Sequence, residues 1–191
     1  MRRAVIAVIG LLMVVGCGEK SKTASEPKVP TPGSFPAAPE GLPGVIAVPA
    51  AGADHVRGKV SYPTAPPAGG DHQAVWQNCG FYSVVVTDEA AVHSLEHGAV
   101  WITYKPDLDA ATKAKLTALA QADTHVLVSP YPNNPTAFVV TAWERQLRLD
   151  QFDEARVMKF IATYAKTGPT VPEPGAVCRS GVGKPPDRPN S

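Results

Sequence analysis

The chain has 191 residues, of which 44% are hydrophobic, and its 18 basic residues nearly balance its 17 acidic ones. A chain of this length and composition can bury the core of one folded domain. The near-neutral charge lacks the basic footprint of proteins that bind nucleic acid, and nucleic-acid binding is therefore not expected.

Residues 1–16 are typical of a secretory signal peptide. Arg2 and Arg3 precede an uncharged apolar run, residues 4–15, that is too short to span a bilayer as a helix. The run ends in Val14-Val15-Gly16-Cys17, which resembles the lipobox of bacterial lipoproteins. We therefore expect cleavage before Cys17, lipidation (palmitate) of Cys17, and a lipid anchor at the cell membrane or outer membrane. An uncleaved anchor, or an ordinary signal with a chance cysteine, is the alternative.

Residues 17–53 are predicted to be the lipidated cysteine and a proline-rich tether. Seven prolines lie between Pro27 and Pro49, and such a segment stays extended because it cannot bury a core. A globular domain is expected over residues 54–178. The Pro/Gly-rich tail, residues 179–191, is predicted to be disordered.

The globular part is predicted to contain strands and helices in mixed order. Runs of β-branched and aromatic residues predict strands over residues 55–62 (an edge strand), 81–87, 99–104, 126–129 and 137–143. Apolar residues at helical spacing predict helices over residues 88–97, 109–122 and from about 150 to the Gly168-Pro169 stop, with Asp88 capping the first helix and Gly98 ending it. This order predicts an α+β fold, a two-layer sandwich of a mixed four- to five-stranded sheet with about three helices on one face.

Two cysteines remain after Cys17, and their pairing has two interpretations. An even pair outside the cytoplasm usually oxidises, which predicts a Cys79–Cys178 disulfide across a loop of roughly 100 residues. The alternative is a pair of thiolate metal ligands.

Four histidines in the first half of the domain are candidate metal ligands. His93 and His97 stand four residues apart, so a helix places both imidazoles on one face, where they can bind one ion. His72 follows a Gly-Gly turn that can bring it to the same site, with Asp71 as its carboxylate partner, and His55 is a possible fourth ligand. Such a set suits zinc or copper(II). The alternative is that these are ordinary surface histidines; His125 is placed outside the site.

The run from His93 to His97 also matches the H-x-x-E-H pattern of inverted zincins, in which the glutamate is the general base. Those proteases need a third ligand, for which Glu144 or Glu154 could be proposed. Glu96 is expected instead to orient a ligating histidine from the second shell, or to pair with Arg145 or Lys105. The tryptophans are expected in the core or around a ligand groove; they are Trp76, Trp101 and Trp143.

The sequence resembles a bacterial family known as domain of unknown function 3105. Six parts of the chain carry the resemblance, and they occur in order between residues 54 and 178: His55-Val56 with Val60-Ser61-Tyr62; Pro66-Pro67-Ala68-Gly69-Gly70-Asp71-His72; Trp76 with Cys79-Gly80-Phe81-Tyr82; His93-Ser94-Leu95-Glu96-His97-Gly98-Ala99-Val100; Ala142-Trp143; and Gly168-Pro169 with Cys178. The chain has Gly69 and Asp71 where the family usually has serine and proline. The resemblance implies an exported or membrane-anchored protein and brings no activity with it.

Three hypotheses follow. The first is a membrane-tethered extracytoplasmic domain, facing the periplasm or the exterior, that binds copper or zinc through His72, His93, His97 and His55. The second is a structural or interaction module of the cell envelope, with an unidentified protein partner. The third is a small zinc hydrolase, in which Glu96 would be essential for turnover; enzymatic activity is the less favoured interpretation.

Overall fold

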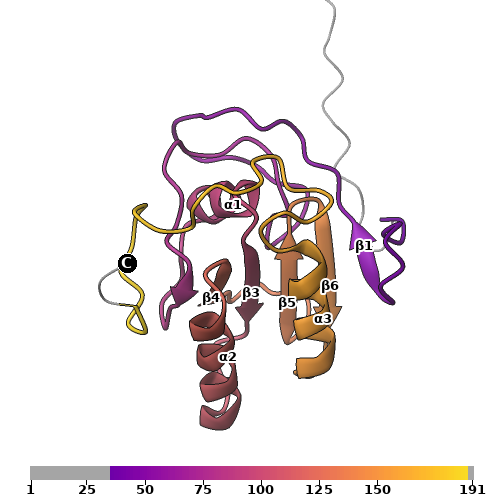
Figure 1. Cartoon of the computed structure of the whole chain (residues 1–191), viewed down its shortest axis with the longest axis vertical. Helices are drawn as coiled ribbons and strands as arrows, with labels where there is room; N and C mark the ends of the chain where they lie inside the picture. The colour runs from indigo at the N-terminus through magenta and orange to yellow at the C-terminus, as the bar shows by residue number, and fades with distance from the viewer. Residues whose placement is uncertain (1–34, 189–191) are drawn as a thin grey trace, which may run out of the picture.

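The computed structural model describes residues 35–188, which form a six-stranded mixed sheet and three helices (Figure 1). The strands are β1 Val45–Ala47, β2 Gly80–Phe81, β3 Val100–Tyr104, β4 Val126–Pro130, β5 Phe138–Ala142 and β6 Arg145–Leu149. The helices are α1 Asp88–Glu96, α2 Ala110–Ala122 and α3 Glu154–Tyr164. The α+β class is confirmed, with six strands where four to five were predicted. The expected signal peptide and Cys17 lie outside the described residues.

The sheet has the order β1-β6-β5-β3-β4-β2, with two parallel and three antiparallel strand pairs. The strands β2, β4 and β3 run parallel, and α2 is the crossover between β3 and β4. The strands β3, β5, β6 and β1 pair antiparallel. The hairpin between β5 and β6 turns through Trp143 and Glu144, and Glu144 adopts a positive φ of 58°. Among the described residues, no helix is long and apolar enough to cross a membrane.

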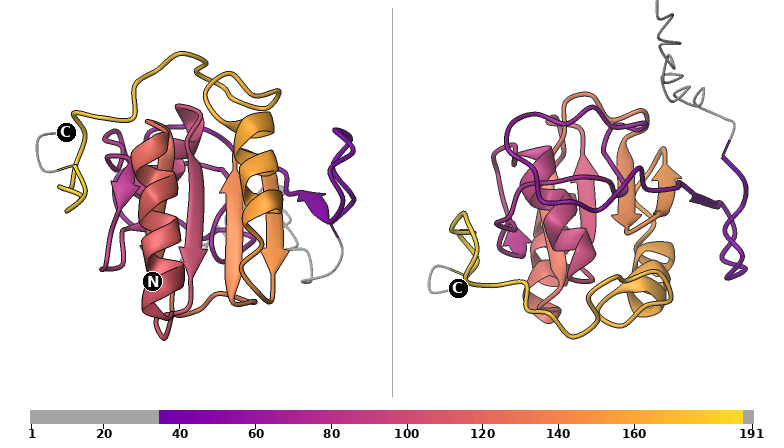
Figure 2. Two further views of the ribbon diagram at one scale, coloured as in Figure 1. Left: turned by 60° about the horizontal axis from the view of Figure 1, so that its bottom comes forward. Right: turned by 90° about the horizontal axis from the view of Figure 1, so that it is seen from above.

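Side chains alternate between the two faces of the sheet and build two cores. Val100, Ile102 and Tyr104 of β3 pack in the core that includes Leu116 of α2 and residues of α3. Trp101 points the other way, into a second core with Leu95 and other residues of α1. The helices α2 and α3 therefore share one face, and α1 covers the opposite one (Figure 2). The predicted placement of all helices on one face is thus corrected for α1.

Two predicted strands are absent or short. Residues 55–62 form no strand; only His55 makes an isolated bridge, to His72. Of residues 81–87, only Phe81 lies in a strand, and Val84 and Val85 are 64% and 56% exposed. A β-branched run favours a strand only where a neighbouring edge and an apolar layer receive it. The pairing with β4 extends to Tyr82, whose N–H donates to the Val128 carbonyl at 2.8 Å, and Val84 and Val85 then face solvent.

The segment predicted to be a tether is folded from residue 35 onward, where the description begins. Val45 and Val48 are buried, and β1 pairs with β6, a strand that the sequence analysis did not predict. Glu40 attaches this N-terminal segment to β6 and α3. Arg145 of β6 donates from Nη2 and Nε to the two carboxylate oxygens of Glu40 at 2.8 and 3.0 Å, and the Tyr164 hydroxyl donates to Glu40 Oε2 at 3.1 Å.

The tail was predicted to be disordered, and this is wrong for residues 179–188. Val182 forms a bridge with Gln77, and Asp187 accepts a hydrogen bond from the backbone N–H of Phe81 at 2.8 Å. These contacts join positions about a hundred residues apart, and local composition does not reveal them. The tail lies beside β2, at one edge of the sheet (Figure 1).

A side chain caps the start of α2 and of α3 but not the start of α1. Asp109 and Asp153 cap α2 and α3, each accepting from the backbone N–H three residues on. Asp88 was expected to cap α1, but Thr87 holds that position without a side-chain hydrogen bond. Asp88 is the first helical residue, and its carboxylate accepts instead from the Tyr131 hydroxyl at 3.2 Å.

Replacement of Glu40 with alanine should lower the free energy of unfolding by about 2–4 kcal/mol, because it leaves the largely buried Arg145 guanidinium without its partner. The hydrogen bonds from Arg145 lower the pKa of Glu40 below its ordinary value of 4.5. A lowered folded-state pKa stabilises the fold above the ordinary value and loses that contribution as the pH falls through the folded value.

In urea denaturation, the free energy of unfolding of Glu40→Ala should therefore lie below that of wild type at pH 7, and this difference should shrink below about pH 4.5. The control is Asp107→Ala, which removes an exposed carboxylate from a turn. Equal stability of wild type and Glu40→Ala at pH 7 would contradict this account of how the N-terminal segment is held.

The disulfide predicted between Cys79 and Cys178 is present, and it joins residues 99 positions apart. Closing so long a loop should stabilise the fold by about 4 kcal/mol through the entropy of the unfolded chain. The Cys79→Ser/Cys178→Ser variant should lose that amount in urea denaturation, and wild type treated with a reductant should unfold at the same midpoint as the variant. An unchanged midpoint in the variant would show that the bridge is energetically neutral.

Candidate metal centre

His55, His72, His93 and His97, which we call the histidine cluster, lie on the α1 side of the sheet, where two loops meet the helix. His55 and His72 stand on loop segments that are bridged to each other: the Val56 N–H donates to the His72 carbonyl at 2.7 Å, and the His72 N–H donates to the Asp54 carbonyl at 3.0 Å. His93 lies on the last turn of α1. Segments nearly forty residues apart therefore bring their imidazoles to one place.

Four side chains form a group that could hold a metal ion. His55, His72, His93 and Glu96 each offer one ligand atom, and these atoms all lie within 4.8 Å of one another. His72, His93 and Glu96 are buried, whereas the side chain of His55 is 49% exposed. The group therefore has three fixed members and one member at the solvent boundary.

Three imidazoles are held in one orientation by backbone carbonyls. The Nδ1 atoms of His72, His93 and His97 lie 2.8, 2.7 and 2.8 Å from the carbonyl oxygens of Gly70, Gln73 and Val177, respectively. A carbonyl oxygen can only accept, so each Nδ1 must carry the hydrogen. Each Nε2 is thereby directed into the cluster, the arrangement by which proteins orient metal-ligating histidines.

The Nε2 atoms meet acceptors at hydrogen-bond distance. His72 Nε2 lies 2.9 Å from Glu96 Oε2, and His93 Nε2 lies 2.9 Å from His97 Nε2. Lone pairs at these separations repel unless a proton or a cation lies between them. The cluster is therefore a buried set of acceptors in which each facing pair needs a proton or a cation between its members.

The pKa of His93 is lowered to about 4, chiefly by burial and also by its neighbours His97, His72 and His55, against the raising effect of the hydrogen bond to Gln73. His93 is therefore neutral at pH 7. With its hydrogen on Nδ1, its Nε2 lone pair is available to a metal ion. His93 is also central, with ring centroids 4.8, 4.8 and 4.6 Å from those of His55, His72 and His97.

The positions of Glu96 and His97 bear on their expected roles. Glu96 was expected to orient a ligand, and its carboxylate lies among the candidate ligand atoms, 2.9 Å from His72 Nε2 and 3.8 Å from His55 Nε2. His97, expected as a core ligand, caps α1, and its Nε2 lies 2.9 Å from His93 Nε2. On a helix, positions three and four apart are both neighbours, so spacing alone does not choose between them.

The other predicted residues fall outside the group. Asp71 accepts from the Asp54 N–H at 3.0 Å and thus holds the loop. His125 contacts the Ala176 carbonyl and the Thr124 hydroxyl, in agreement with its predicted place outside the site. Arg145, a proposed partner of Glu96, pairs with Glu40 instead.

The tryptophans divide between core and cluster. Trp101 is fully buried beneath α1. Trp143 meets the ring of His72 edge-on at 6.1 Å. Trp76 lies against the cluster, with its ring centroid 4.6 Å from that of His97 and 5.5 Å from that of His93. Trp76 and Trp143 therefore border the histidines.

Sequence reasoning missed the segment that closes the cluster on its remaining side. Glu173 lies on the chain after α3, and its Oε2 is 3.4 Å from His97 Nε2. The Glu173 N–H donates to the Glu96 carbonyl at 3.1 Å, and Val177 accepts from His97. We call residues 173–178 the strap. Its only signal in the sequence is Cys178, whose disulfide with Cys79 ends it.

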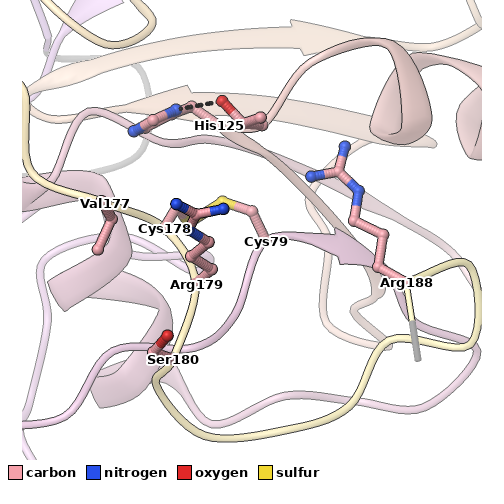
Figure 3. A pocket seen from close by; sticks show the side chains of 8 residues that line it. Cys79, His125, Val177, Cys178, Arg179, Ser180 and Arg188 are labelled. Atoms are coloured by element: carbon pink, nitrogen blue, oxygen red, sulfur yellow. Dashed lines mark hydrogen bonds between the residues drawn. A yellow bond between two sulfur atoms is a disulfide. The ribbon is translucent and has the colours of Figure 1, made fainter. Parts of the chain in front are cut away.

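A cavity of about 650 Å³ lies beside the disulfide, and none of His55, His72, His93 and His97 lines it (Figure 3). It is lined by residues from four parts of the chain: Cys79, Thr124, His125, Val177, Cys178, Arg179, Ser180 and Arg188. Arg188 donates to the Asp123 carbonyl at 2.7 Å and to the Ala120 carbonyl, so it satisfies the C-terminal end of α2. The strap thus lies between this cavity and His97.

The comparisons with known proteins give a family and no activity. Residues 55–180 match the family described as "Protein of unknown function (DUF3105)". Neither the curated proteins nor the solved structures contain a match to the chain. The matched span includes every member of the histidine cluster, both disulfide cysteines and the strap. The chain therefore belongs to the DUF3105 family.

Proposed function

We propose that the chain is a membrane-tethered extracytoplasmic protein that binds one zinc or copper(II) ion through His55, His72, His93 and Glu96. The observation that carries the proposal is the shared orientation of the imidazoles. Backbone carbonyls take the Nδ1 hydrogens of His72 and His93, and the Nε2 atoms face a carboxylate and another imidazole at 2.9 Å. A divalent cation removes the repulsion that this arrangement otherwise contains.

The donor set favours borderline metals. Imidazole nitrogen with one carboxylate oxygen suits zinc or copper(II), whereas copper(I) prefers thiolate and thioether ligands. Both cysteines of the described domain are in the disulfide and offer no thiolate. Ligand atoms around one tetrahedral ion stand roughly 3 Å apart. His55, whose side chain is 49% exposed, can close on the ion with the least rearrangement of the core.

The proposed location rests on the sequence and on the disulfide. The signal pattern and Cys17 predict export and a lipid anchor, facing the periplasm or the exterior. The domain contains a disulfide. Disulfides form and persist in such oxidising compartments and are rare in the cytoplasm. Metal handling in the cell envelope, as a binder without turnover, is consistent with both.

The position of Glu96 favours binding over hydrolysis. In an H-x-x-E-H protease both histidines hold the metal and the glutamate remains available as a base. Here the Glu96 carboxylate lies within the candidate ligand set and contacts His72, so it is engaged by the site itself. A carboxylate that neutralises the ion serves retention of the metal rather than activation of a water.

Titration of the full-length chain in detergent by calorimetry should show one zinc or copper(II) ion bound per chain. The His93→Ala variant should lose more affinity than the roughly 10–100-fold that removal of an outer-shell partner costs, because His93 is the central ligand. The matched control is His125→Ala, a partly buried histidine outside the group, which should bind as wild type does.

Thermal unfolding keeps this test independent of any folding defect in the variant. Saturating metal stabilises the native state of a binder, by about 2.7 kcal/mol at a hundredfold excess over the dissociation constant. Wild type and His125→Ala should show this rise and His93→Ala should not. If His93→Ala binds as tightly as wild type, the proposed centre is wrong, and a chain without metal affinity would favour the envelope-module hypothesis.

The lipid anchor has its own test. In cells that process lipoproteins, wild type should fractionate with membranes and carry acyl mass on an N-terminal peptide that begins at Cys17. The Cys17→Ser variant should lose that mass, because serine cannot form the thioether. Acyl mass found elsewhere in the chain, or none in wild type, would refute lipidation at Cys17.

A further inference from the structure

The histidine cluster continues past the four-residue group toward the surface. His93 Nε2 lies 2.9 Å from His97 Nε2, and His97 Nε2 lies 3.4 Å from Glu173 Oε2. His93 thus belongs both to the buried group and to a short row of acceptors leading out of it. Neither His97 nor Glu173 has a place in the four-residue group, so this row needs its own explanation.

Exposure rises along the row. His93 is 3% exposed, and the side chains of His97 and Glu173 are 6% and 54% exposed. A divalent ion loses its hydration at a high cost unless ligands replace the waters as they leave. A row that starts at an exposed carboxylate and ends among buried imidazoles replaces those waters stepwise.

We infer that His97 and Glu173 form an outer coordination position, through which a divalent cation enters and leaves the inner position of the proposed metal centre. The inference rests on the proposed function, because it requires the inner position to hold the ion. His93 is the ligand common to both positions. The ion is bound at the outer position by His93, His97 and Glu173, and at the inner position by His55, His72, His93 and Glu96.

The transfer is a ligand exchange with no change in oxidation state. As the ion moves inward, its bonds to Glu173, to His97 and to one remaining water break, its bonds to Glu96, His72 and His55 form, and the bond to His93 is kept. One carboxylate replaces another and one imidazole replaces another. Each position supplies one carboxylate charge to the ion, and the third imidazole of the inner position, His55, takes the place of the last water.

The strap positions the outer ligands. Glu173 is tied to the end of α1 by the hydrogen bond from its N–H to the Glu96 carbonyl at 3.1 Å. His97 is oriented by Val177, the residue before the disulfide cysteine Cys178. These two attachments fix the outer position relative to α1, which also carries His93 and Glu96.

The test is the kinetics of zinc exchange in the full-length chain. Loading is followed by stopped flow from free zinc, and release is followed by transfer to a fluorescent zinc indicator in excess. In Glu173→Gln, which keeps the shape of the side chain and removes its charge, both rate constants should fall about tenfold, the lower range of what a focused charge adds to an association rate. The dissociation constant should remain that of wild type.

The control Asp107→Asn removes one carboxylate charge from an exposed turn after β3 and should leave both rates unchanged. A second variant, His97→Gln, should slow exchange in the same way as Glu173→Gln. Adding the Glu173→Gln change to it should have little further effect, because both residues serve one position.

Three results would overturn the inference. Rates unchanged in Glu173→Gln would show that ions do not pass this way. Slower loading with unchanged release would make Glu173 a source of long-range attraction only. Faster release with weaker affinity would make it a ligand of the final state. A wild-type chain that takes up no zinc would instead refute the proposed metal centre, and the outer position with it.

Discussion

The site depends on three backbone carbonyls that fix the direction of three buried imidazoles. Gly70 and Gln73 lie on the loop before α1, and Val177 lies on the strap after α3. Each carbonyl accepts a hydrogen bond from the Nδ1–H of one histidine, and the Nε2 atom of that histidine therefore faces inward. A set of converging acceptors in a buried place is costly unless a proton or a cation satisfies it. The rest of the domain supplies the rigidity that holds this arrangement.

The helix α1, which carries His93 and Glu96, is short, and it ends where the chain must turn close to the end of α3. Gly98 follows the capping His97 with a φ of 85°, and a Cβ there would approach the Lys166 carbonyl oxygen within 2.5 Å. Only glycine lets the chain turn back so close to the end of α3, where the Lys166 N–H donates to the Gly98 carbonyl at 2.7 Å. The end of α1 is thereby attached to the segment that leads into the strap.

Two helices could be predicted from local sequence signals, because residues close in the chain determine where they begin and end. Residues 88–97 and 109–122 end at capping or glycine positions, and their helices form within a residue or two of the expectation. The strand β6 and the folded part of the N-terminal segment were missed because their stability comes from partners far away. Arg145 was considered as a partner of Glu96, and its actual partner, Glu40, stands 105 positions earlier in the chain.

The candidate site shows the same division. The i, i+4 spacing of His93 and His97 and the loop histidines His55 and His72 were recognisable, and the structure brings them together. The spacing could not say whether Glu96 or His97 faces the two loop histidines, since both are neighbours of His93 on a helix. The hydrogen bond from His97 Nδ1 to the Val177 carbonyl orients His97 toward the strap, and Glu96 lies beside His72.

The disulfide links this choice to the compartment in which the protein folds. Cys178 follows Val177 directly, and its bond to Cys79 attaches the strap to the loop before α1; the Cys79 N–H also donates to the Cys178 carbonyl at 2.9 Å. Disulfides form and persist in oxidising compartments. The acceptor that orients His97 is therefore fixed by a bond that a reducing cytoplasm does not maintain. Completion of the cluster and oxidation of Cys79 and Cys178 are thus coupled through one peptide unit.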